Sequence, residues 1–169
     1  MQFFVLDQAP TGDNEAARVD VLAADGTRYG DAPRCEACGE YVGMRRWLPP
    51  YRVELDAWGR EFGDLASRLG GGDPLVSVRF KALWECSGLS GLSGFEPVEV
   101  VKVRRQRKLR GDLPEYFRAV VSRSRTMIDL AASEFEWGQA PNCTACRLGH
   151  LLKRWKRIII DQATWTGED

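Results

Sequence analysis

Short apolar segments separated by turn residues run along most of this chain, and they predict strands. We expect a strand in each of six segments, residues 3–7, 18–22, 51–55, 95–103, 116–122 and 157–161. A short helix is the alternative for 116–122. The Asp25-Gly26 pair after the second segment is typical of a turn. This pattern favours a mostly antiparallel sheet.

Helical spacing occurs in one clear stretch, residues 75–86. Its apolar residues recur at intervals near 3.6, which predicts an amphipathic helix: Leu75, Val76, Phe80, Leu83 and Trp84. Asp73 or Ser77 could cap it, and the glycines from Gly88 to Gly94 predict a loop after it. Residues 62–69 predict a second, short helix that three glycines end. The expected fold class is therefore α+β, with one or two helices.

Composition indicates an ordinary globular protein. The chain has 169 residues, of which 44% are hydrophobic and 28% charged, and we expect a single domain over 1–169. Its 24 basic and 24 acidic residues cancel, so no overall attraction to nucleic acid or to an anionic membrane is expected. No segment resembles a signal peptide or a membrane span. The expected compartment is the cytoplasm, where thiols stay reduced.

Four of the five cysteines form two pairs of identical spacing, Cys35/Cys38 and Cys143/Cys146. A Cys-x-x-Cys turn places two thiolates on one side of a tight loop, where each can bind Zn²⁺ at about 2.3 Å. Two such knuckles predict a structural zinc site made of four cysteines, with no open position. Glycine follows the first knuckle, whereas Arg147 follows the second.

Other interpretations of these cysteines remain. The separation of the knuckles by about a hundred residues exceeds that of an ordinary zinc ribbon. A redox Cys-x-x-Cys, disulfides or plain core cysteines are the alternatives. His150 could replace one thiolate, although a position beside the metal site or on the surface is favoured. We expect Cys86, the unpaired cysteine, to be a buried apolar residue.

Basic residues concentrate in two segments, 102–110 and 153–157. Solvated strand edges or a protein partner are favoured over a nucleic acid, given the zero net charge. Six tryptophans include candidate interface anchors. With one histidine, no P-loop and no dinucleotide fingerprint, the chain is not expected to be an enzyme.

Several motifs in a specific order resemble the myxobacterial double-CxxCG paralogous family. They cover nearly the whole chain: Cys35-Glu36-Ala37-Cys38-Gly39, Trp47-Leu48-Pro49-Pro50, Leu75-Val76-Ser77 with Arg79-Phe80, Gly88-Leu89, Gly91-Leu92 and Gly94-Phe95, Pro97-Val98-Glu99, residues 133–137 (SEFEW), Cys143 to Cys146, and Trp165 with Gly167-Glu168-Asp169. Members of that family are described as immunity proteins, partners of swarming-inhibition lipoprotein toxins.

The resemblance implies an immunity protein that binds and neutralises a cognate protein toxin, with the four cysteines as ligands of a structural Zn²⁺. It also implies a longer chain, so either a version shortened at the C-terminus or a fragment of a longer protein is expected. Candidates for the toxin-facing surface are Arg104, Arg105 and Arg107. The first alternative is a zinc-ribbon-like nucleic-acid-binding module, and the second is a metal-dependent enzyme, which needs an open zinc position.

Overall fold

The computed structural model describes residues 19–68, 73–105, 108, 110–121, 125–165 and 167. The chain forms two compact units, of which unit 1 comprises Met1–Gly30 and Arg46–Val121, and unit 2 comprises Asp31–Arg45 and Ser122–Asp169. The prediction of one domain over 1–169 stays a prediction. The strand expected at residues 3–7 lies outside the described residues.

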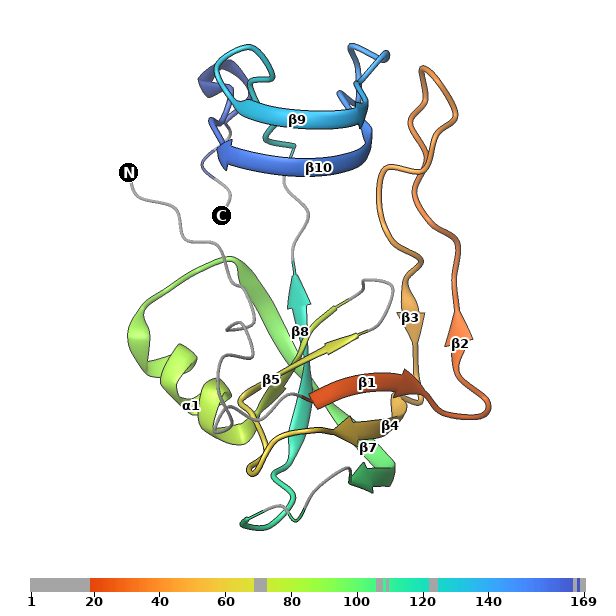
Figure 1. The fold of residues 1–169 in the computed structure, drawn as a ribbon, viewed down its shortest axis with the longest axis vertical. Coiled ribbons are helices and arrows are strands. Elements are labelled where there is room, and N and C mark those ends of the chain that lie inside the picture. The colour runs from red at the N-terminus through yellow and green to blue at the C-terminus, as the bar shows by residue number, and fades with distance from the viewer. Residues whose placement is uncertain are drawn as a thin grey trace. The chain divides into compact units, whose positions relative to one another are not determined.

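Unit 1 is a closed barrel of six strands in the order β1-β4-β7-β8-β6-β5 (Figure 1). Neighbouring strands are antiparallel except for the parallel pairs β1–β5 and β4–β7. The barrel strands are β1 (Val19–Ala23), β4 (Arg52–Ala57), β5 (Leu65–Arg68), β6 (Leu75–Ser77), β7 (Leu92–Arg105) and β8 (Tyr116–Val121). A short antiparallel ladder joins β2 (Arg28–Tyr29) to β3 (Trp47–Leu48).

Alternation along the strands places the core of unit 1. On β4, Val53, Leu55 and Ala57 are buried, whereas the residues between them are only half-buried. The core cluster consists of Val19, Val21, Trp47, Val53, Leu55, Ala57, Ala66, Leu75 and Tyr116. The strands predicted at 18–22, 51–55, 95–103 and 116–122 are confirmed, and the largely antiparallel sheet fits the predicted α+β class. Closure of this sheet into a barrel was not predicted.

The helix begins later than the apolar spacing predicts. Residues Leu75–Ser77 form β6, and α1 runs from Val78 to Ser87. Ser77 separates the two elements because its hydroxyl accepts a hydrogen bond from the Phe80 N–H and so caps the helix. Gly88, at φ 69°, ends it. No helix among the described residues is both long and apolar enough to cross a membrane.

The short helix predicted over residues 62–69 is wrong. Residues Leu65–Arg68 form β5, which pairs with β1 and β6 and closes the barrel. Ala66 is fully buried there. Pairing with two neighbouring strands satisfies the backbone of this segment and overrides its local helical pattern.

Unit 2 contains a two-stranded antiparallel ribbon, β9 (Glu134–Gln139) with β10 (His150–Arg157), drawn in blue in Figure 1. A 3-10 turn, η1, spans Gln162–Thr164. The strand predicted at 157–161 is wrong, because β10 ends at Arg157. Beyond it, Ile159 donates its N–H to the Ser133 hydroxyl and accepts from the Asp129 N–H, so this segment bonds to a loop.

Very little of unit 2 is buried. Among its described residues only Cys35 and Ser133 reach the buried class, each at 9% exposure. The core cluster of the chain lies wholly in unit 1. The described part of unit 2 therefore lacks an apolar core, and a unit of this kind needs another source of stability.

Candidate metal centre

The two Cys-x-x-Cys loops have the same backbone fold. In the first, the Gly39 N–H donates to the Cys35 carbonyl at 2.8 Å, and in the second the Arg147 N–H donates to the Cys143 carbonyl at 2.9 Å. Both donors lie four residues after the first cysteine of their loop. Gly39 has φ 77° and Arg147 has φ 52°, so both adopt the left-handed conformation. Arg147 therefore takes the backbone role that glycine takes in the first loop.

A left-handed arginine costs about 1 kcal/mol relative to glycine, because its Cβ crowds the following carbonyl. The side chain of Arg147 makes two contacts that offset this cost. Its Nη1 donates to the Ile128 carbonyl at 3.1 Å and to Asp161 Oδ2 at 2.7 Å. The guanidinium, together with the Ala163 N–H, lowers the pKa of the Asp161 carboxyl. These bonds connect the second loop to one segment that precedes the ribbon in sequence and to another that follows it.

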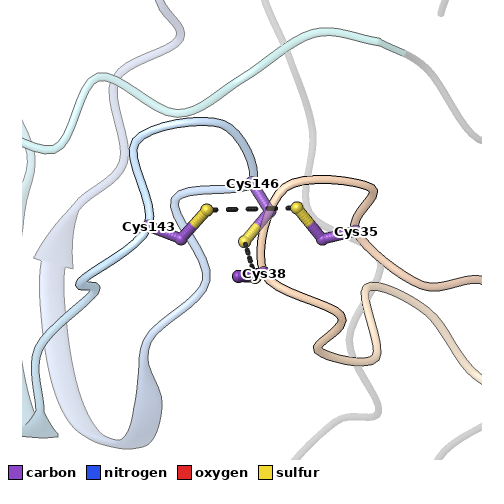
Figure 2. Close-up of side chains that lie close together, drawn as sticks. All are labelled: Cys35, Cys38, Cys143 and Cys146. Carbon is purple, nitrogen blue, oxygen red and sulfur yellow. Dashed lines mark hydrogen bonds between the residues drawn. The ribbon is translucent and has the colours of Figure 1, made fainter.

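The four sulfurs converge on one point (Figure 2). Cys35 Sγ lies 3.9 Å from Cys143 Sγ, and Cys38 Sγ lies 3.8 Å from Cys146 Sγ. All four sulfurs lie within 4.8 Å of one another. A tetrahedron of sulfurs about 2.3 Å from a zinc ion has edges of about 3.8 Å. The convergence expected from the sequence is confirmed, and the cluster could hold a metal ion.

Disulfide bonds do not account for this arrangement. A disulfide needs about 2.05 Å between sulfurs, and each cysteine of the cluster is a free thiol. The Sγ–Sγ contacts Cys35–Cys143 and Cys38–Cys146 each join one loop to the other across 108 residues of sequence. The arrangement is that of four donors around a shared centre.

Backbone N–H groups and mutual proximity give the four thiols different acidities. The pKa of the Cys143 thiol falls to about 7, because the N–H groups of Cys146 and Ala145 donate to its sulfur. The Glu40 N–H lowers the pKa of the Cys38 thiol, but desolvation and the other three cysteines outweigh it and raise that pKa to about 12. Four thiolates this close repel one another, and a divalent cation among them removes that penalty.

The remaining candidates lie elsewhere. His150 is exposed at the start of β10 and does not belong to the cysteine cluster. The expectation of a buried Cys86 is wrong, because α1 has no buried residue and this thiol is exposed. Arg104 and Arg105 end β7 in unit 1, where Arg104 donates to Glu54 at 2.7 Å. Arg107 lies outside the described residues.

Sequence reasoning missed the packing behind the second loop. A Cβ on Gly149 would lie 2.7 Å from two ring atoms of Trp137 and 2.9 Å from Pro141 Cδ. Only glycine lets the Trp137 ring lie this close to the chain after Cys146. The signal available in the sequence was Gly149 itself, three residues after the knuckle.

No family model, no curated protein and no solved structure matches this chain. Membership of the double-CxxCG family stays a prediction.

Proposed function

We propose that this protein binds one structural Zn²⁺ through Cys35, Cys38, Cys143 and Cys146, and that it acts as a binding protein without chemistry of its own. The observation that carries the proposal is the convergence of the four sulfurs: two Sγ–Sγ distances, 3.9 Å and 3.8 Å, match the edge of a zinc–thiolate tetrahedron, and all four atoms lie within 4.8 Å of one another. A four-sulfur donor set selects zinc or iron–sulfur chemistry over magnesium or calcium. The compact spacing fits a single ion.

A set of four thiolates fills all four positions of tetrahedral zinc. No position remains for a water or a substrate, so such a site is structural. In this chain the ion would link the segment between β2 and β3 to the ribbon segment. It would replace the apolar core that the described part of unit 2 lacks.

The binding activity that we propose is that of an immunity protein, which neutralises a cognate protein toxin by occupying its surface. This part rests on the resemblance of the sequence motifs. The nucleic-acid-binding alternative gains little support from the basic segments. Arg104 pairs with Glu54, Arg154 lies 4.0 Å from Glu136, and Arg157 pairs with Glu134 at 3.1 Å.

Metal content tests the zinc proposal. Elemental analysis of protein purified without added metal should give one zinc per chain. The Cys35→Ser and Cys143→Ser variants should each lose it, because each knuckle supplies two ligands of one site. Cys86→Ser is the matched control and should keep the ion, since Cys86 lies on α1. Absence of zinc from the parent would contradict the shared site. Loss of zinc in only one of the two cysteine variants would contradict it as well.

Growth protection tests the immunity proposal. The chain is co-expressed with toxin domains of the swarming-inhibition class, one at a time, and growth and complex formation are measured. Protection by the parent against one of these toxins, together with a purified complex, supports the proposal. Protection without a complex would contradict neutralisation by binding.

A further inference from the structure

The β9–β10 ribbon has two chemically distinct faces. Directly opposed residues of an antiparallel ladder carry their side chains on the same face. The apolar face, which we define as Phe135, Trp137, Leu152 and Trp155, follows from the opposed pairs Leu152–Trp137 and Trp155–Phe135. The charged face follows from the opposed pairs Arg154–Glu136 and Arg157–Glu134.

Much of the apolar side-chain surface of this region contacts solvent. Trp155 is 50% exposed and Leu152 is 44% exposed, whereas Phe135 and Trp137 are half-buried with ring centroids 5.3 Å apart. Ile158, just after β10, is 42% exposed. Of these, Leu152 and Trp155 share one face of the ribbon, and exposed apolar side chains gathered on one face mark an interaction surface.

Leu151 combines an unfavourable backbone conformation with an exposed apolar side chain. It has φ 56°, a left-handed conformation that a leucine adopts only with strain, and its side chain is 76% exposed. Residues held in this way concentrate at functional surfaces.

Two lysines interrupt the ladder of β10. The register shifts between Leu152 and Arg154 and again between Trp155 and Arg157, so Lys153 and Lys156 are the extra residues of two bulges. Bulges re-aim side chains, and a bulged edge that carries lysine resists pairing with another strand. A partner would therefore meet the side chains of the ribbon rather than extend its sheet.

The charges of the ribbon leave a positive surplus. The two glutamates of β9 offset Arg154 and Arg157, at 4.0 Å and 3.1 Å respectively. Lys153 and Lys156 are exposed and make no ion pair within the part of the chain that the structure describes. The surplus of two positive charges therefore lies beside the exposed Trp155.

We propose that the ribbon is the docking surface for an acidic protein segment. Leu152 and Trp155 receive an apolar side chain of the partner, and Lys153 and Lys156 meet its carboxylates. The inference rests on the proposed function, because it assigns the surface of that binding protein to unit 2. This surface is not the one that the sequence suggested, because the suggested arginines of β7 belong to unit 1.

A nucleic acid fits this surface less well. Glu134 and Glu136 offset two of the four cations of β10, and the remaining surplus of two positive charges is small for a phosphate backbone. Trp155 could stack with a base, but the exposed aliphatic side chains of Leu152 and Ile158 offer no further ring for base stacking. A protein segment uses both the aliphatic surface and the two lysines.

Peptide selection tests the inference. A display library of random 12-residue peptides is selected on the zinc-loaded full chain, and the enriched peptides are synthesised with a fluorophore for anisotropy. We expect sequences rich in Asp and Glu with at least one large apolar residue. Trp155→Ala should weaken their binding by about 30-fold, as for an interface anchor. Lys153→Glu with Lys156→Glu should lower the association rate by about tenfold at low salt.

Matched controls separate the ribbon from the general surface. Trp58→Ala removes another exposed tryptophan, and Lys102→Glu with Lys108→Glu reverses two exposed lysines of unit 1. These controls should bind like the parent, and every variant should keep one zinc. Selected peptides without acidic enrichment, or peptides indifferent to Trp155→Ala, overturn the inference. Tight binding of a labelled 12-nucleotide oligouridine also overturns the inference if Lys153→Glu with Lys156→Glu abolishes that binding.

The toxin co-expression assay distinguishes this inference from the proposed function. If the parent protects cells and Trp155→Ala protects equally well, the ribbon is not the docking surface and the immunity function stands. If acidic peptides require Trp155 while the parent protects against no toxin and forms no toxin complex, the surface stands and the immunity function fails.

Discussion

Removal of the metal should unfold unit 2 and leave unit 1 folded. The perturbation is chelation, or the Cys143→Ser substitution. Unit 1 holds the core cluster in a closed barrel, whereas the described residues of unit 2 bury only Cys35 and Ser133. Without the ion, little remains to offset the conformational entropy that unit 2 regains on unfolding.

The magnitude follows from loop closure. With unit 1 folded, the ion closes only the segments from Gly30 to Cys35 and from Val121 to Cys143, about 27 residues, at about 3.5 kcal/mol. With unit 1 unfolded, it closes the 108 residues between Cys35 and Cys143, at about 4.8 kcal/mol. The difference, about 1.3 kcal/mol, is the stability that unit 1 should lose with the metal. For a unit of this size it corresponds to a fall in Tm of about 5–10 °C.

Hydrogen exchange followed by mass spectrometry provides the assay. Peptides from residues 31–45 and 125–165 should lose protection on chelation, and peptides from 46–68 and 73–105 should keep most of theirs. Chelated Cys86→Ser should behave like the chelated parent, because this thiol is no ligand. Loss of protection in both units together, or unchanged protection in unit 2, would show that the metal does not stabilise unit 2 selectively.

Three further predictions concern single positions. Arg147→Ala keeps the left-handed strain and loses the guanidinium bonds, whereas Arg147→Gly removes the strain. The Arg147→Gly protein should therefore bind zinc about fivefold more tightly than the Arg147→Ala protein in a chelator competition. Equal zinc affinities of the two variants would contradict this. Gly149→Ala should displace the Trp137 ring, change its fluorescence and lower the Tm. Gly94→Ala, whose Cβ would meet open space, should change none of these. A Gly149→Ala protein with unchanged fluorescence and Tm would disprove the close packing. Arg79 lowers the pKa of Asp64, so this carboxylate stabilises the fold above its ordinary pKa near 4 and stops doing so as pH falls through the lowered value. The stability gap between the parent and Asp64→Asn should therefore be largest near neutral pH and shrink in acid, and a gap that widens in acid would show the sign to be wrong.

Local patterns predicted the elements that depend on local physics. Alternation over residues 51–55 identified β4, because one side of that strand faces the barrel interior. The matched Cys-x-x-Cys spacing identified the four converging thiols, because a knuckle is a local loop with its own hydrogen bonds. The hydroxyl of Ser77 was one of two suggested caps, and it caps α1.

Elements that depend on distant partners were predicted poorly. Leu75 and Val76 match helical spacing, yet they are buried in β6 because β5 and β8 lie on either side. Residues 158–161 have strand-like composition, but the loop around Asp129 and Ser133 takes their backbone bonds. Barrel closure, with two parallel strand pairs, leaves no signature in any single segment.

X-ray absorption at the zinc edge reports the atoms bound to the metal in the purified protein, so it examines the four-cysteine site itself. We expect four sulfur neighbours at about 2.3 Å in the parent, and the same shell in a His150→Ala variant. A shell of three sulfurs with one nitrogen or oxygen neighbour near 2.0 Å would contradict the four-cysteine site and the structural role built on it.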